Sequence, residues 1–118
     1  MTIPIIKLGK HLIVTIQDEI SDKTAVEAQE KILYKITETR SSGLLIDLSV
    51  INVIDSFLGR VLNDIAKMAK LMGVETVVSG IQPGVAITFM ELGLRLDGIK
   101  TALDIEQGME YLLKAKRE

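Results

Sequence analysis

A serine with an adjacent carboxylate, Asp55-Ser56, follows a short apolar run and precedes a long amphipathic segment. The apolar run, residues 44–48, predicts a buried strand, and the amphipathic segment predicts a helix that begins at the serine. A phosphoryl group on Ser56 would meet the unpaired backbone N–H groups and the positive end of the helix dipole. No neighbouring residue in the sequence would activate Ser56 as a nucleophile. We therefore interpret Ser56 as a residue that is modified and recognised, not as a catalytic group.

Simpler roles are open for the same residues. Ser56 is a good helix N-cap, Asp55 could cap the helix equally well, and Asp47 could merely end a strand. Metal binding by Asp47 is not supported, because no His, Asp or Glu accompanies it at the spacing of metal ligands. We expect no metal and no cofactor, and we retain Asp55 as a candidate contact for a kinase.

Two other features could suggest catalysis or nucleotide binding. His11 is the only histidine, and a Ser-His-Asp triad would have to bring it across the sheet to Ser56, so we expect His11 at the surface or in an edge strand. Residues 80–84 (GIQPG) precede a helix but lack the Gly-Lys-Ser/Thr ending of a P-loop and the GxGxxG spacing, which favours a simple turn and helix start. Neither feature therefore predicts an enzyme. A nucleotide-binding or hydrolytic α/β domain is a competing class that stoichiometric nucleotide binding would revive.

Composition limits the size of the fold and the kind of partner. The chain of 118 residues has 14 basic and 16 acidic side chains, a net charge of −2, no cysteine and 3% aromatic residues. Interspersed charges and few aromatic residues argue against nucleic acid and anionic membranes as partners, and favour another protein. The lack of cysteine, of a signal sequence and of a membrane-spanning run predicts a cytoplasmic location. We expect one domain over residues 1–118.

The spacing of apolar residues predicts the elements that position Asp55 and Ser56. The expected strands span residues 3–8, 12–16, 44–48, 74–78 and 99–102, and the expected helices begin near residues 25, 56, 83 and 104. Gly9-Lys10 suits a type II′ hairpin turn between the first two strands. The order β-β-α-β-α-β-α-β-α predicts an α/β fold with a mixed, mostly parallel sheet and about four helices. In such sheets the loops after the strands carry function, and Asp55 and Ser56 lie on one of these loops.

The residues around the serine resemble the phosphoserine motif of STAS domains, the fold of anti-sigma-factor antagonists. The resemblance is carried by residues 47–49 (DLS), then Asp55-Ser56 and a helix. Residues 80–86 and 91–93 are similar to the second half of STAS proteins of stressosomes. Within the family, the chain is most similar to the small stressosome scaffold subunits of RsbS type.

This resemblance implies a non-catalytic signalling scaffold with a defined set of partners. Proteins of this type assemble with longer RsbR-type STAS proteins into a large cytoplasmic complex, the stressosome, which holds a switch kinase of RsbT type. Phosphorylation of the motif serine, here Ser56, would release the kinase to regulate the general stress response. A PP2C-type phosphatase of RsbX type, a homodimer and a large hetero-oligomeric assembly are also implied.

The expected partner-binding surface surrounds the serine. Its residues are Val53, Ile54, Asp55, Phe57, Leu58 and Arg60. Many STAS antagonists have a small residue directly after the acceptor serine, whereas Phe57 stands here, which favours the stressosome group. The alternative is a free-standing anti-sigma-factor antagonist that binds an anti-sigma factor kinase under control of Ser56 phosphorylation. That alternative predicts a monomer or dimer instead of a very large assembly. STAS domains also include modules that regulate transporters, and in that role this chain would need a membrane partner supplied in trans.

Overall fold

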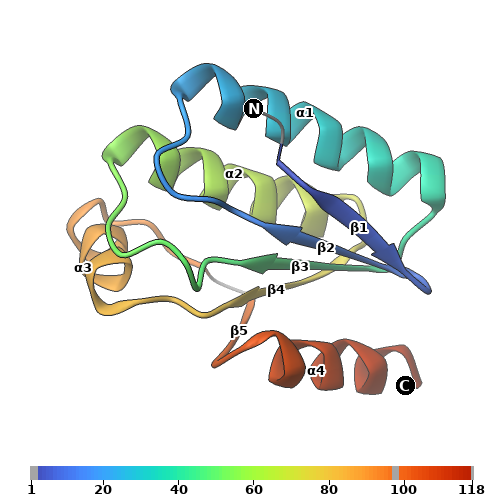
Figure 1. Ribbon diagram of the computed structural model, residues 1–118. Helices are drawn as coiled ribbons and strands as arrows, with labels where there is room; N and C mark the ends of the chain where they lie inside the picture. The colour runs from blue at the N-terminus through green and yellow to red at the C-terminus, as the bar shows by residue number, and fades with distance from the viewer. Residues whose placement is uncertain (1–2, 97–98, 118) are drawn as a thin grey trace.

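The computed structural model describes residues 3–96 and 99–117, which form a five-stranded sheet with helices on both faces (Figure 1). The strands are β1 (Ile5–Leu8), β2 (His11–Thr15), β3 (Gly43–Asp47), β4 (Glu75–Ser79) and β5 (Lys100–Ala102). The helices are α1 (Asp22–Thr39), α2 (Ser56–Leu71), α3 (Pro83–Glu91) and α4 (Ile105–Arg117). The predicted fold class and the predicted order of elements are confirmed.

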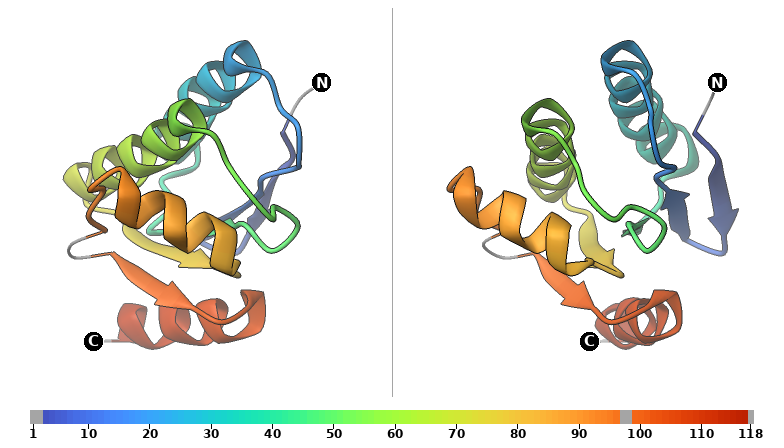
Figure 2. Two further views of the ribbon diagram at one scale, coloured as in Figure 1. Left: turned by 90° about the vertical axis from the view of Figure 1, so that its left-hand side faces the viewer. Right: turned by 60° about the vertical axis from the view of Figure 1, so that its left-hand side comes forward.

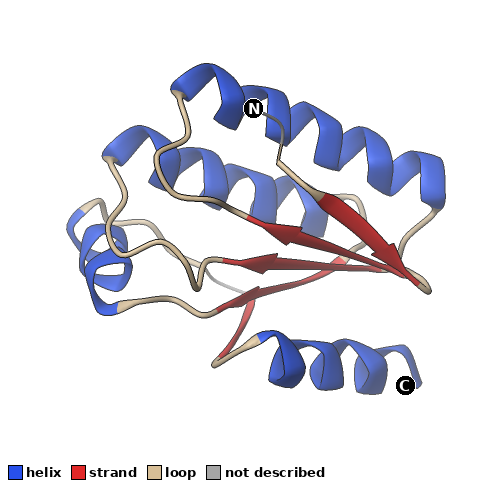
Figure 3. Cartoon of the chain, viewed as in Figure 1, coloured by secondary structure: helices blue, strands red, loops and turns tan. Residues whose placement is uncertain are grey.

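The strands follow one another in the sheet in the order β1-β2-β3-β4-β5. β1 pairs with β2 in antiparallel fashion, and all later pairs are parallel. Because each parallel strand is added on the same side of the last, right-handed crossovers place α1, α2 and α3 on one face of the sheet. α4 follows the last strand and covers the opposite face (Figure 3). The carboxyl ends of β2 to β5 therefore share one edge.

The hairpin between β1 and β2 has the predicted turn. Leu8 pairs with His11, which leaves Gly9 and Lys10 as the two turn residues. Gly9 has φ +62, whereas Lys10 is not among the residues with positive φ. This combination is the one that a type II′ turn requires.

His11 is buried, with 4% of its surface exposed, and it begins the second strand of the sheet. The expectation of a surface or edge-strand position was wrong, because β1 lies outside β2 and takes the edge. The imidazole ring occupies space beside Gly43, where an added Cβ atom would collide with it. The small residue at position 43 thus makes room for a histidine inside the fold.

Two apolar cores hold the layers together. The main core lies between the sheet and the helices α1, α2 and α3, which cover one of its faces. A smaller core on the other face joins Leu45 of β3 and Val77 of β4 to Leu112 of α4. All five residues of β3 are buried because this strand is covered on both faces. β3 therefore provides a rigid base for the loop that follows it.

Candidate functional site

The candidate site lies at the carboxyl edge of the sheet, where the loop after β3 leads into α2. Figure 2 shows this loop, residues 48–55, beside the start of α3 and below the start of α2. The loop after β2, residues 17–20, reaches the same edge because β2 and β3 are parallel. The structure therefore brings three separate chain segments together around Ser56.

Asp47 anchors the beginning of the β3–α2 loop. Its side chain is buried, with 2% exposure. The hydroxyl of Ser79, at the end of β4, donates to Asp47 Oδ1 at 2.9 Å. The hydroxyl of Ser49 donates to Asp47 Oδ2 at 2.6 Å. Asp47 thus does more than end a strand, because its carboxylate joins two strand ends to the loop.

Apolar side chains fix the rest of the loop at every third residue. Leu48 and Ile51 are fully buried, and Ile54 is 9% exposed. Between them, Val50 and Val53 are exposed by 53% and 69%. The three buried side chains therefore fix the backbone of the loop, while the two valines between them are exposed to solvent.

Two glycines, one before α3 and one in its first turn, allow the start of this helix to pack against the loop. Gly80 has φ +70, and a Cβ atom there would lie 2.8 Å from Ser49 Cβ. A Cβ atom on Gly84 would overlap the carbonyl oxygen of Asn52. The side-chain amide of Gln82 also donates to the Ser49 carbonyl at 3.1 Å. The predicted turn and helix start are confirmed, and this segment also supports the loop.

Replacement of Gly84 by alanine is expected to destabilise the protein by about 1–3 kcal/mol, because the new methyl group displaces backbone atoms of the loop. Helix propensity alone predicts the opposite, a gain of about 1 kcal/mol. Urea unfolding measures the difference. Gly59→Ala is the matched control, because its added Cβ would meet only side-chain ends at 3.2 Å or more. A Gly84→Ala variant as stable as wild type would contradict the close contact.

Ser56 is the first residue of α2, not its N-cap. Asp55 takes the N-cap position with φ −85 and ψ 172, and its Oδ1 atom accepts the Leu58 N–H at 2.8 Å. Ser56 is exposed. Its hydroxyl makes no hydrogen bond to any residue that the structure describes. The sequence allowed either Asp55 or Ser56 as the N-cap of this helix, and in the structure the N-cap is Asp55. The hydroxyl of Ser56 is therefore not needed to cap the helix.

The other residues of the expected surface divide into exposed and buried groups. Val53 and Phe57 are exposed by 69% and 39%, and Arg60 is exposed as well. Leu58 is half-buried. Ile54 belongs to the main core and can offer little surface to a partner. The exposed surface next to the serine is therefore mostly Val53 and Phe57, flanked by the charges of Asp55 and Arg60.

Asp55→Ala is expected to lower the free energy of unfolding by about 1 kcal/mol, because the Leu58 N–H loses its capping acceptor. Urea denaturation checks this value. Asp64→Ala, on the exposed side of the same helix, is the control and is expected to change stability by less than about 0.5 kcal/mol. Equal effects from the two variants would show that the cap contributes nothing.

A hollow of about 280 Å³ adjoins the start of α2, between the β2–α1 loop and the β3–α2 loop. It is lined by residues 17–20 from the first loop and by Asp55 and Leu58 from α2 and its cap, among others. The sequence alone did not indicate residues 17–20, because they carry no recognisable motif. Their position follows from the topology, since β2 ends at the same edge as β3.

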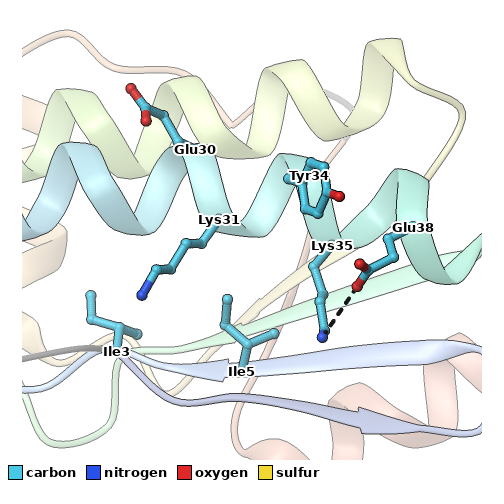
Figure 4. Close-up of a pocket in the computed structure, with 7 residues that line it drawn as sticks. All are labelled: Ile3, Ile5, Glu30, Lys31, Tyr34, Lys35 and Glu38. Carbon is cyan, nitrogen blue, oxygen red and sulfur yellow. Dashed lines mark ion pairs between the residues drawn. The ribbon is translucent and has the colours of Figure 1, made fainter.

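A wider hollow of about 730 Å³ lies between α1 and β1 (Figure 4). Ile3 and Ile5 line it on the strand side, and Lys35 of α1 pairs with Glu38 at 3.4 Å. It shares no residue with the site around Ser56. Within residues 3–96 and 99–117, no helix could span a membrane, and no three His, Cys, Asp or Glu side chains are grouped to hold a metal ion.

Known proteins resemble this chain over nearly all of its length. Residues 2–108 match the family model of the STAS domain. The structure of Moorella thermoacetica RsbS with a serine-to-glutamate substitution is similar with a TM-score of 0.89, at 39% identity and 98% coverage of both chains. A chain from a structure of the stressosome, a signal integration and transduction hub, has a TM-score of 0.87 and 39% identity, and covers 98% of this chain and 100% of that one.

Sequence relatives include longer proteins. The RsbT co-antagonist protein RsbRC of Bacillus subtilis strain 168 is 32% identical over 101 residues, which are 83% of this chain and 36% of RsbRC. The chain spans about a third of the length of this relative and of RsbRD. The predicted resemblance to STAS proteins of RsbS type is confirmed. The chain belongs to the STAS-domain family.

Proposed function

We propose that this protein is a non-catalytic scaffold of a stressosome, which holds a switch kinase of RsbT type and releases it when Ser56 is phosphorylated. The full-length likeness to RsbS and to a stressosome chain supports the scaffold role. Relatives named as RsbT co-antagonists support a kinase of that type as the partner. The observation that carries the proposal is the position of Ser56, whose exposed hydroxyl has no hydrogen-bond partner within the described residues.

The fold can accept a phosphoryl group at this position. Ser56 is the first helical residue, and the first N–H groups of a helix have no acceptor within the helix. Negative charge in the first turn is stabilised by these N–H groups and by the helix dipole. Phosphorylation should therefore leave the domain folded.

A partner seated over the site would respond differently. It would cover Val53 and Phe57, which are exposed apolar side chains beside Ser56. Phosphorylation adds a charge of about −1.5 to −2 at this place. Burial of that charge against apolar groups carries a large desolvation cost, so the complex dissociates while the scaffold stays intact.

The proposal includes further partners. Longer RsbR-type STAS proteins would co-assemble with this chain, and a homodimer would be a unit of the large assembly. A PP2C-type phosphatase of RsbX type would remove the phosphate from Ser56 and restore kinase binding. The assembly would be cytoplasmic.

Affinity capture tests this proposal. Wild type, Ser56→Ala and Ser56→Asp are immobilised, and proteins retained from a native extract of the source organism are identified by mass spectrometry. We expect wild type and Ser56→Ala to retain an RsbT-type kinase and RsbR-type proteins, and Ser56→Asp to lose the kinase alone. Thr37→Glu, which adds a charge on the exposed side of α1, is the control and should retain both.

Two results would overturn the proposal. The same partners on wild type, Ser56→Ala and Ser56→Asp would show that Ser56 does not control binding. Capture of an anti-sigma factor kinase by a monomeric or dimeric protein, without RsbR-type proteins, would favour the free-standing antagonist. Size-exclusion chromatography with light scattering of the purified mixture distinguishes that result from a very large assembly.

A further inference from the structure

The hollow beside the start of α2 has an apolar floor. The floor residues are Ile20, Ile51, Ile54 and Leu58, which come from both loops and from the first turn of the helix. Ile51 and Ile54 belong to the main core, and Ile20 and Leu58 pack against it. The floor is therefore a fixed part of the fold.

The rim of the same hollow is acidic. Asp18, Glu19 and Asp55 line it, and no lysine or arginine does. All three residues are exposed. Asp18 Oδ1 accepts the Glu19 N–H at 3.1 Å, and Asp55 Oδ1 accepts the Leu58 N–H at 2.8 Å. Within the described part of the chain, no basic side chain pairs with any of these three carboxylates.

We propose that this hollow receives an arginine side chain of the kinase that covers Ser56. The inference rests on the proposed function, because it assigns a recognition contact to the same complex. An arginine has an aliphatic stem that suits Ile20 and Leu58, the half-buried residues of the floor, and a guanidinium group that suits a carboxylate rim. The negative charge of the rim is thus complementary to the proposed occupant.

Two other kinds of ligand fit the hollow less well. Its volume of about 280 Å³ is close to the lower limit of the range of about 300–1,000 Å³ that is typical of small-molecule sites. A metal ion needs several carboxylates within one coordination sphere, and the described residues include no such group of three. One long side chain from a docked protein satisfies both the size and the charge.

The hollow and the serine would have separate tasks. Ser56 is not among the residues that line the hollow. The cationic contact would position the kinase on the loops, while the phosphoryl group would act on the apolar surface of Val53 and Phe57. Val53 and Asp55 line the hollow and also adjoin Ser56, so of the rim residues only Asp18 and Glu19, which lie on the β2–α1 loop, can be changed without altering the surface next to the serine.

Neutralisation of two rim residues tests this inference. The double variant Asp18→Asn/Glu19→Gln removes two charges without shortening a side chain, and leaves the Asp55 cap in place. We expect its Kd for the purified RsbT-type kinase, measured by calorimetry, to rise about tenfold and to depend less steeply on salt. The control is Glu27→Gln/Glu30→Gln, which removes two exposed charges from α1 and therefore has the same net charge as the rim variant. The control should change the Kd by less than about twofold.

Glu19 offers a second variant that separates recognition from stability. Its φ of +57 is a left-handed conformation that glycine adopts without strain. We expect Glu19→Gly to keep or raise the Tm and still to weaken kinase binding. Weaker binding that appears only together with a lower Tm would mean that Glu19 has a structural role alone.

The outcomes distinguish this inference from the proposed function. One result is that wild type binds the kinase, Ser56→Asp does not, and the rim variants bind like wild type. The proposed arginine contact would then be wrong, and the proposed control of kinase binding by Ser56 would stand. If neither wild type nor Ser56→Ala binds the kinase, the proposed function fails, and the inference fails with it.

Discussion

Ser56→Asp is expected to weaken binding of the purified RsbT-type kinase by roughly 30-fold to several thousandfold. This range corresponds to about 2–5 kcal/mol, the cost of burying a charge without a partner in a protein interface. Aspartate adds one negative charge, whereas phosphoserine adds about −1.5 to −2, so the phosphorylated protein should lie nearer the upper end. Isothermal calorimetry with wild type, the variant and the phosphorylated protein measures the three affinities.

The same substitution should not unfold the domain. A carboxylate in the first turn of α2 faces the positive end of the helix dipole, which stabilises a helix by about 0.3–1 kcal/mol. The Tm of Ser56→Asp should therefore equal or exceed that of wild type. Ser56→Ala is the matched control: it breaks no hydrogen bond among the described residues and should bind the kinase within about twofold of wild type. A Tm that falls together with the affinity would show that lost binding reflects lost structure.

Local signals in the sequence were sufficient to predict the order of the elements. Pro83 marked the first residue of α3, and Asp104 marked the start of the last helix. In the structure α4 begins one residue later, at Ile105, and Asp104 Oδ1 accepts the Gln107 N–H at 2.8 Å. The Gly9-Lys10 pair marked the hairpin turn. Each of these signals depends on the backbone preferences of adjacent residues, which do not require knowledge of the rest of the fold.

The ends of the elements were harder to predict, because they depend on contacts with other segments. Apolar spacing placed the start of the first helix near residue 25, whereas α1 begins at Asp22 and is capped by Ser21. The first turn of α1 faces solvent and so has no apolar pattern. Leu48 was expected inside the third strand, but β3 ends at Asp47. The Leu48 N–H still donates to the Ser79 carbonyl of β4, whereas the Leu48 carbonyl accepts the Ile51 N–H at 3.0 Å, because the chain turns into the loop there.

The sequence identified the chemical centre of the candidate site but not its surroundings. Asp55 and Ser56 are adjacent in the chain and were found together, although only the backbone angles decide which one caps the helix. Asp18 and Glu19 were missed because they are more than 30 positions away in sequence and reach the site through the parallel pairing of β2 and β3. A rule that assembles all loops at the carboxyl edge would have found them.

Leu112→Ala is expected to lower the free energy of unfolding by about 2–5 kcal/mol, the other large effect that the structure predicts. Leu112 is 1% exposed and packs with Leu45 and Val77, which are fully buried. Its truncation would leave a cavity in the small core between α4 and the sheet. The midpoint of urea unfolding measures the loss. Leu113→Ala, on the same helix but 52% exposed, is the control and should cost less than about 1 kcal/mol.

The kinase affinity of the same variant tests whether the face of the sheet covered by α4 takes part in kinase binding. α4 packs on β3, β4 and β5 from the face opposite α2, and neither Leu112 nor its neighbours line the hollow beside Ser56. Under conditions in which Leu112→Ala is folded, its Kd for the kinase should therefore stay within about twofold of the wild-type value. A folded Leu112→Ala protein that has lost the kinase would instead show that α4 takes part in binding, and the interface would have to extend beyond the carboxyl edge of the sheet.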